Sequence, residues 1–313
     1  MIVNHFILTR FNLRLWRQDK NGSPVRTSAW LEHRFALFER YCLPSVAAQS
    51  CKDFQWIVLF DSKTPEAFRE RIEGYKAQCP QLVPVFVEPE NGRFFAEVFR
   101  SEVCRLLRPL RQAQGPAQQP TQGPAQQPAK DPALRQAQGP AQEPRVLTTY
   151  LDNDDALAVG FVEDVQKRAA ELPDGTFISY TEGFQYYTDH SYVMRIHYPR
   201  NHFVSVVESG NPLTLKTIYG YGSHYYLDSI PGSKIERVAS CPLWCEVIHD
   251  RNMGNDAYFL HAKMMGDPEL MRRDFAVDAT VKSSSGLYLF HFLPRYVKTF
   301  FKRVGYKLFG RKW

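Results

Sequence analysis

The chain has 313 residues, of which 44% are hydrophobic and 23% charged, a composition typical of globular proteins and not of wholly disordered chains. No stretch reaches the roughly 18 unbroken apolar residues of a membrane-spanning helix, so we do not expect an integral membrane protein. The net charge of +6 would indicate nucleic-acid binding only if the basic residues formed one patch on the fold.

Strands and helices are predicted to alternate along most of the chain, which indicates a mainly parallel, doubly wound α/β sheet. Residues 54–60 (FQWIVLF) read as a strand buried on both faces. Thr64 and Pro65 then predict an N-cap and a first helical residue, and Pro84 places its strand near a sheet edge. The expected elements are a strand at 5–11, a helix at 30–49, a strand at 54–60, a helix at 64–77, a strand at 82–87, a helix at 94–107, a strand at 146–151 and a helix at 161–172.

A low-complexity segment interrupts this alternation at residues 111–144. The nonapeptide LRQAQGPAQ occurs twice, at 110–118 and 134–142, and Gln, Pro, Ala and Gly dominate between the copies. Such a segment cannot bury enough apolar surface to offset its ordering entropy, so we predict a disordered insertion rather than a proline-rich docking site. Residues 1–110 and 145–294 are then expected to form one domain.

The six cysteines form no CxxC pair, and the N-terminus lacks the features of a signal peptide, which together predict a reduced, cytosolic protein. Cys241, Cys245 and His249 would give only three zinc ligands at an uncommon spacing. We therefore interpret both cysteines as buried thiols.

Polar side chains follow three of the predicted strands. Arg10 and Asn12 follow the first, Asp61 the second, and the run Asp152 to Asp155 (DNDD) the fourth. Ligands of parallel sheets bind at the carboxyl ends of the strands, so these groups are expected to converge. Closely spaced carboxylates raise one another's pKa, and Mg or Mn would relieve that conflict. The alternative is a solvated turn in which Asp155 caps the next helix.

Six segments resemble, in order and spacing, the rhamnosyltransferase family of bacterial GT-A-type glycosyltransferases, over about residues 1–255. They are HFILTRFN (5–12), FERYCLPSVAAQS (38–50), FQWIVLFD (54–61), LTTYLDNDDAL (147–157), HFVSVVES (202–209) and WCEVIHDRN (244–252). The resemblance implies a GT-A-like, Rossmann-type mixed sheet with flanking helices, as one domain followed by a C-terminal helical tail. Two features depart from the pattern: the insertion, and Tyr150, which stands where a basic residue is expected.

The resemblance also implies a metal site for Mn or Mg. Asp152 and Asp154 would form the DXD motif, Asp155 would be a further ligand, and His249 would complete the shell. Asp152 is alternatively a contact to the ribose, or a ligand that acts through water. His224 is a weaker candidate, either for the metal or for the acceptor region.

The remaining implied roles concern the donor and the acceptor. Asp61 would contact the nucleobase, Arg10 a phosphate, and Asn12 the base or ribose. An inverting transfer needs a carboxylate base for the acceptor hydroxyl. We expect Glu208 in that role, with Glu182 and Asp250 as rivals.

These features predict a metal-dependent glycosyltransferase that moves a sugar, rhamnose by the family's name, from a nucleotide-sugar donor to a cell-surface glycan or lipid-linked acceptor. The alternatives are a metal-dependent phosphohydrolase and a non-catalytic carbohydrate-binding protein on a degenerate transferase fold. The sequence has no GxGxxG after the first strand, no Walker A motif and no GxSxG.

The excess positive charge lies at the C-terminus. Residues 295–313 contain seven basic residues and no acidic one, interleaved with bulky apolar residues. This pattern predicts a basic amphipathic helix that binds an anionic membrane surface, or else one that docks on the domain. We therefore expect a cytoplasmic protein, peripheral at the inner face of the membrane, with no nucleic-acid partner.

Overall fold

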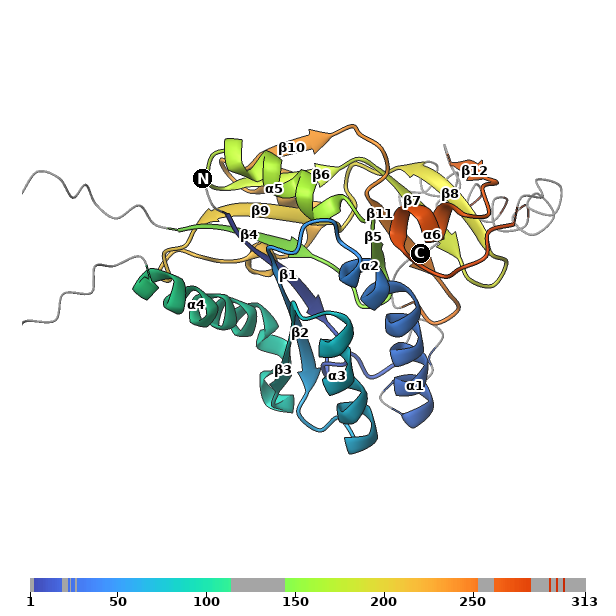
Figure 1. Cartoon of the computed structure of the whole chain (residues 1–313), viewed down its shortest axis with the longest axis horizontal. Helices are drawn as coiled ribbons and strands as arrows, with labels where there is room; N and C mark the ends of the chain where they lie inside the picture. Colours follow the sequence, from blue (N-terminus) through green and yellow to red (C-terminus); the bar gives the residue numbers. More distant parts are fainter. Residues whose placement is uncertain are drawn as a thin grey trace, which may run out of the picture.

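The computed structural model describes residues 3–18, 22, 24, 25, 27–113, 144–252, 262–282, 293, 297 and 301. Its centre is a seven-stranded sheet of order β10-β6-β9-β4-β1-β2-β3, joined by a five-stranded sheet of order β12-β8-β7-β11-β5 (Figure 1). The strands of the larger sheet are β1 (Val3–Arg10), β2 (Gln55–Asp61), β3 (Leu82–Val87), β4 (Arg145–Tyr150), β6 (Thr176–Tyr180), β9 (Val204–Ser209) and β10 (Lys234–Val238). The smaller sheet contains β5 (Ala156–Leu157), β7 (Glu182–Tyr187), β8 (Tyr192–His197), β11 (Trp244–Ile248) and β12 (Lys263–Met265).

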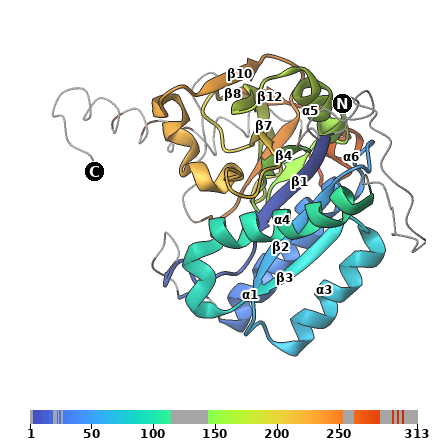
Figure 2. The ribbon, with the colours of Figure 1, turned by 90° about the vertical axis from the view of Figure 1, so that its left-hand side faces the viewer.

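Helices cover both faces of the larger sheet. They are α1 (Ser28–Leu37), the π-helical turn η1 (Phe38–Cys42), α2 (Leu43–Ala47), α3 (Glu66–Gln78), α4 (Phe95–Ala113), α5 (Phe161–Glu171) and α6 (Leu270–Phe275), with 3₁₀ helices η2 (Pro89–Phe94), η4 (Ile218–Tyr221) and η5 (His224–Ser229). Figures 1 and 2 show α4 on one face of the sheet and α1 and α3 on the other.

The buried strand β2 shows why its sequence is continuously apolar. Trp56, Val58 and Phe60 pack into the core beneath α1 and α3, whereas Ile57 and Leu59 pack into the core beneath α4. Successive side chains of a strand point to opposite faces, so a strand covered on both faces needs apolar residues at every position. The predicted double burial of this strand is confirmed.

The larger sheet is mixed, as the resemblance implies. β1 pairs in parallel with β2 and β4, and β2 with β3, while β9 runs antiparallel to both β4 and β6. β3, with Pro84, lies at the edge of the sheet, as predicted. The reversal of β9 decides which of its residues reach the candidate site.

Two local expectations near α1 to α3 have different outcomes. The predicted helix at 30–49 forms, but as α1, a π turn and α2, with Pro44 in the first turn of α2. Thr64 does not cap α3, which begins at Glu66. Its hydroxyl instead donates to the Asp61 carbonyl at 2.6 Å and accepts from the Asn12 amide at 3.0 Å.

Both ends of the Gln/Pro-rich insertion lie at the amino end of the sheet. Helix α4 continues to Ala113, three residues into the segment predicted as insertion, and β4 begins at Arg145 beside Val3, the first residue of β1 (Figure 1). Residues 114–143 are outside the described residues. Of the predicted tail at 295–313, only the helical positions Val297 and Phe301 are described. Among the described residues, no helix is both long and apolar enough to cross a bilayer.

Candidate active site

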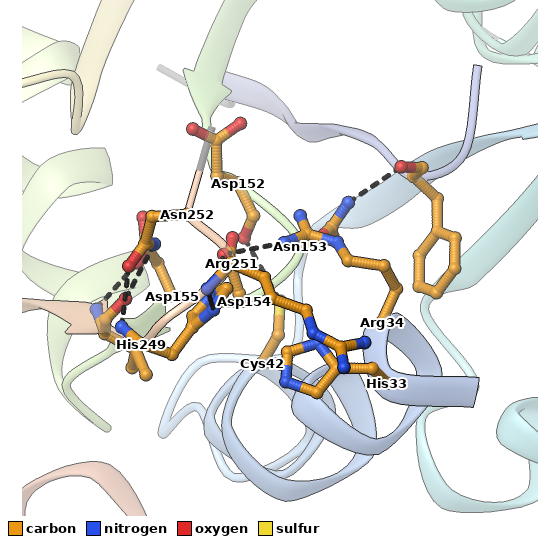
Figure 3. A network of polar contacts seen from close by, with 12 residues as sticks. His33, Arg34, Cys42, Asp152, Asn153, Asp154, Asp155, His249, Arg251 and Asn252 are labelled. Atoms are coloured by element: carbon orange, nitrogen blue, oxygen red, sulfur yellow. Dashed lines mark hydrogen bonds and ion pairs between the residues drawn. The ribbon is translucent and has the colours of Figure 1, made fainter. Parts of the chain in front are cut away.

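The loop Asp152–Asp155 follows β4 at the carboxyl end of the sheet and is fixed to the end of β1. The Asn153 amide donates to the carbonyl oxygens of Arg10 and Phe11, both at 2.9 Å. Asn153 also accepts from the Arg34 guanidinium, which comes from α1 (Figure 3). The sequence therefore places its acidic run where the ends of parallel strands converge, as expected.

Asp154 is neutralised by the protein itself. One of its oxygens, Oδ2, contacts Arg34 Nη1 at 3.0 Å and His249 Nε2 at 2.9 Å. Burial alone would raise the pKa of Asp154, but the charge of Arg34 and the hydrogen bond from His249 hold it well below its usual range. Asp154 thus forms a buried ion pair that anchors the loop to α1 and to the end of β11.

His249 reaches the acidic loop, but both of its ring nitrogens are engaged. Nδ1 accepts from the Arg251 backbone N–H at 3.1 Å, so Nε2 carries the proton and donates it to Asp154. Figure 3 shows the Asp152 carboxylate pointing away from Asp154 and His249. The four predicted metal ligands are therefore divided between two places, with Asp154 and His249 in the ion pair with Arg34.

Asp152, Asp155 and His202 form the other group, which we call the carboxylate–histidine cluster. One ligand atom from each lies within 4.8 Å of the others. Asp155 is fully buried, its Oδ2 contacting His202 Nε2 at 2.8 Å and its Oδ1 accepting from the Val247 N–H at 2.8 Å. It is therefore neither solvated nor the cap of a helix. Two carboxylates and an imidazole are suitable ligands for a divalent cation such as Mn.

Burial and charge oppose each other in this cluster. Burial raises the pKa of Asp155. Burial alone would lower the pKa of His202, but its hydrogen bond to Asp155 and the surrounding carboxylates raise it. One hydrogen bond joins the two groups, and its proton would have to leave before both could act as ligands of a cation.

Arg10 lies beside Tyr150, the residue that stands in the sequence where the family pattern has a basic one. Its guanidinium lies 4.9 Å from the Phe95 ring, 5.1 Å from that of Tyr219 and 5.5 Å from that of Tyr150. Arg10 Nη2 donates to the Tyr150 hydroxyl at 2.6 Å and lies 3.5 Å from Asp152, and Tyr150 donates in turn to Asp152 at 3.1 Å. A cation from β1 thus faces the 28% exposed Asp152 side chain.

Asn12 and Asp61 brace the ends of β1 and β2. Asn12 Oδ1 accepts from the Asp61 N–H at 3.0 Å and its Nδ2 donates to Thr64, while Asp61 accepts from Arg14 Nε at 2.6 Å and from the Lys63 N–H at 2.7 Å. Both side chains are buried. Their predicted contacts to base and ribose stay predictions.

The expectation that Glu208 acts beside the aspartates is corrected. Glu208 pairs with Val146 at the start of β4, because β9 is antiparallel. Roughly 13 Å of strand separates Val146 from Tyr150 at the other end. The Glu208 carboxylate accepts from the backbone N–H groups of Lys216 and Thr217 at 2.9 and 3.0 Å, and so anchors the chain that leads to η4.

The two other acids expected as possible bases, Glu182 and Asp250, both lie beside basic side chains. Glu182 pairs with His197 at 2.7 Å and with Arg195 at 3.1 Å, and Asp250 is exposed, 3.9 Å from His33.

Cys245 is buried but Cys241 is exposed, so the interpretation of two buried thiols is correct for one only.

Sequence reasoning missed three buried residues at this site. Arg34 and His202 are described above, and the third is Glu246 on β11, which accepts from the Gln185 amide at 2.5 Å. Burial raises the pKa of Glu246, and the charges of His202, Asp154 and Asp152 act on it. Two of the three stand in segments that carry the family resemblance, HFVSVVES and WCEVIHDRN, which was the signal available.

The mixed sheet, with the acidic loop at the carboxyl ends of its parallel strands, defines an α/β protein with a polar site at that end of the sheet. The sequence profile of a family described as "putative rhamnosyl transferase" matches residues 22–102 and 92–256. Because these ranges span well over half of the chain, the protein belongs to this family.

Other comparisons add little beyond the family. The crystal structure of S. aureus TarS 1–349 is similar with a TM-score of 0.38 and 11% identity, over 78% of this chain and 60% of that one. The chain thus spans less than two thirds of TarS 1–349, and a likeness this distant carries no functional argument. No curated protein matches the sequence.

Proposed function

We propose that the chain is a glycosyltransferase that transfers a sugar from a nucleotide-sugar donor to a saccharide acceptor with the help of Mn or Mg. The observation that carries the proposal is the carboxylate–histidine cluster, which lies at the carboxyl end of the sheet and faces Arg10. The family description supports a transferase and suggests rhamnose as the sugar.

The donor set of this cluster fits a divalent cation, and we assign Asp152, Asp155 and His202 as its ligands. Such an ion would neutralise the donor diphosphate and stabilise the nucleoside diphosphate as it leaves. Arg10, whose guanidinium packs against three aromatic rings, would supply a second positive charge that binds a phosphate. Asp154 and His249 position the loop through Arg34 and are not ligands in this assignment.

Glu246 replaces Glu208 as our candidate for the general base. It is a buried carboxylate on β11 that accepts a hydrogen bond from Gln185. The charges of His202 and Asp152 act on its pKa, so it lies close to the cluster. A carboxylate there can accept the proton of an acceptor hydroxyl beside the bound donor.

The acceptor is proposed to be a cell-surface glycan or a lipid-linked saccharide. Support comes from the basic residues 295–313, which would hold the enzyme on anionic lipid. A chain truncated before residue 295 should lose sedimentation with phosphatidylglycerol vesicles. If the chain that includes residues 295–313 does not sediment with these vesicles either, membrane binding is no longer part of the proposal.

The activity is tested with purified protein, a panel of nucleotide sugars that includes dTDP-rhamnose, and either Mn or Mg. We expect release of nucleoside diphosphate that stops when the metal is chelated, and a rise in melting temperature when metal and nucleoside diphosphate are added together. Release of inorganic phosphate without sugar transfer would favour a phosphohydrolase. The absence of both turnover and stabilisation would contradict the proposal.

A further inference from the structure

Two tyrosines of η5 expose their rings to solvent close to the candidate site. Tyr225 is 49% exposed and Tyr226 is 68% exposed, although most large aromatic side chains of the described chain are buried. Tyr198, just after β8, donates from its hydroxyl to the Tyr225 hydroxyl at 3.2 Å. The exposed rings therefore belong to an organised surface that includes Tyr198, the residue that follows β8.

A continuous line of rings connects this surface to the carboxylate–histidine cluster. Tyr150, which donates to Asp152, lies 5.6 Å from the His202 ring, and His202 lies 5.8 Å from the His224 ring. His224 in turn lies 4.0 Å from the Tyr225 ring. The line begins where the donor diphosphate is proposed to bind and ends on the exposed surface.

The η5 segment is held in place by local structure. Gly222 has φ of +80°, a conformation that glycine adopts without strain, and the Ser223 hydroxyl accepts from the Tyr225 N–H at 3.4 Å. Asp228 at the other end pairs with Arg200 at 3.3 Å and with Arg237 at 2.5 Å. The tyrosines are thus presented by a braced turn, which lowers the entropy cost of binding to them.

The chemistry of this surface fits a saccharide. Sugar rings present C–H faces that pack on aromatic rings, and hydroxyl groups that bond to charged and hydroxylic side chains. Here Tyr225 and Tyr226 supply the rings, and the Arg200–Asp228 pair lies at the other end of the same short helix. An aliphatic partner would remove water from this charged pair without offering it a hydrogen bond in return.

We infer that Tyr198, His224, Tyr225 and Tyr226 form the subsite for the acceptor saccharide. This inference rests on the proposed function, since it takes the sugar transfer to occur at the adjacent cluster. The subsite binds the acceptor's sugar rings and directs a hydroxyl toward the donor.

The test is a ligand-observed NMR titration of the full chain with a rhamnose disaccharide, and with maltose and diacetylchitobiose for comparison. We expect binding of at least one disaccharide, and about a tenfold weaker affinity in the variant Tyr225→Ala/Tyr226→Ala, since two stacking contacts are lost. Tyr225→Phe/Tyr226→Phe, which keeps the rings, should stay within about twofold of the original affinity. Leu213→Ala is the matched control, because Leu213 is 93% exposed and lies at the amino end of the sheet, near Glu208.

Nucleoside diphosphate release without acceptor is measured on the same variants. Equal saccharide affinity in the double alanine variant, or no binding by the original chain, overturns the subsite even if donor turnover is intact. The protein could instead bind a saccharide through the tyrosines but neither bind nor turn over any nucleotide sugar. That result would support a saccharide subsite and contradict the transferase proposal. Melting temperatures close to that of the original chain show that the variants fold.

Discussion

At the scale of single residues, the three aspartates of the loop after β4 differ in how their charges are balanced. Asp154 is compensated by Arg34 and His249, and Asp155 by His202, all within 3.0 Å. Asp152 meets its nearest cation, Arg10, at 3.5 Å and remains partly exposed. A ligand that arrives from solvent therefore meets Asp152 first, whereas Asp155 and His202 can both bind a cation only when the proton between them leaves.

The metal assignment can be tested by comparing two histidines. His202→Gln should abolish the Mn-dependent rise in melting temperature in the presence of nucleoside diphosphate, because it removes a proposed ligand. His249→Gln should keep this rise while lowering the starting melting temperature, because it weakens the buried ion pair of Asp154. Thermal denaturation with and without Mn measures both effects, and the opposite pattern would restore Asp154 and His249 as the ligands.

The base assignment can be tested by comparing two glutamates. Glu246→Gln should lower kcat by about 10²- to 10⁴-fold, which is the usual contribution of a general base. Glu208→Gln should leave kcat within a few-fold and destabilise the fold by about 1–3 kcal/mol, because one oxygen that accepts backbone N–H bonds becomes an amide. Steady-state kinetics and urea denaturation distinguish the two, and full activity of the Glu246 variant would exclude it as the base.

At the scale of elements, the direction of β9 decides the composition of the site. His202 precedes β9 and lies at the carboxyl end of β4. Glu208, near the carboxyl end of β9, lies beside the amino end of β4. The smaller sheet then closes over the loop, with β11 supplying the Val247 N–H to Asp155 and the Glu246 side chain. Contact between the two sheets is therefore needed for an intact site.

A glycine within the smaller sheet gives a prediction about the packing of its neighbouring strands β7 and β11. A Cβ added at Gly183, on β7, would overlap the buried Trp244 ring of β11. Gly183→Ala should therefore destabilise the protein by about 1–3 kcal/mol or more, through overpacking. Gly74→Ala is the control, since nothing lies within 4 Å of its Cβ position on α3, and it should stabilise by about 0.5–1 kcal/mol. Equal melting temperatures for both variants would contradict this account.

At the scale of the whole molecule, the residues that flank the insertion lie at the end of the sheet opposite to the candidate site. Ala113 ends α4 and Arg145 opens β4 at the amino end, whereas Asp152 lies beyond its carboxyl end. The insertion interrupts the sequence directly before the strand that carries the site, but it joins the fold at the other end of that strand.

Replacement of residues 114–143 by a short Gly/Ser linker should consequently leave donor turnover within about twofold and the melting temperature nearly unchanged, because loop length costs little free energy. Nucleoside diphosphate release and thermal denaturation of the shortened chain measure this. A large loss of turnover at an unchanged melting temperature would show that the insertion takes part in function.

The order of strands and helices in the first half, the burial of β2 and the place of the acidic loop could be predicted from the residues alone, because periodicity and strand ends are local properties of the chain. The family could be recognised from six short segments, because their order and spacing resemble those of its members. Which side chains meet could be read only from the folded chain. The pairing of Asp154 with Arg34 and His249, of Asp155 with His202, and the removal of Glu208 from the site depend on strand direction and on contacts between residues far apart in sequence. A buried charge needs a partner, and the sequence does not show which partner the fold brings to it.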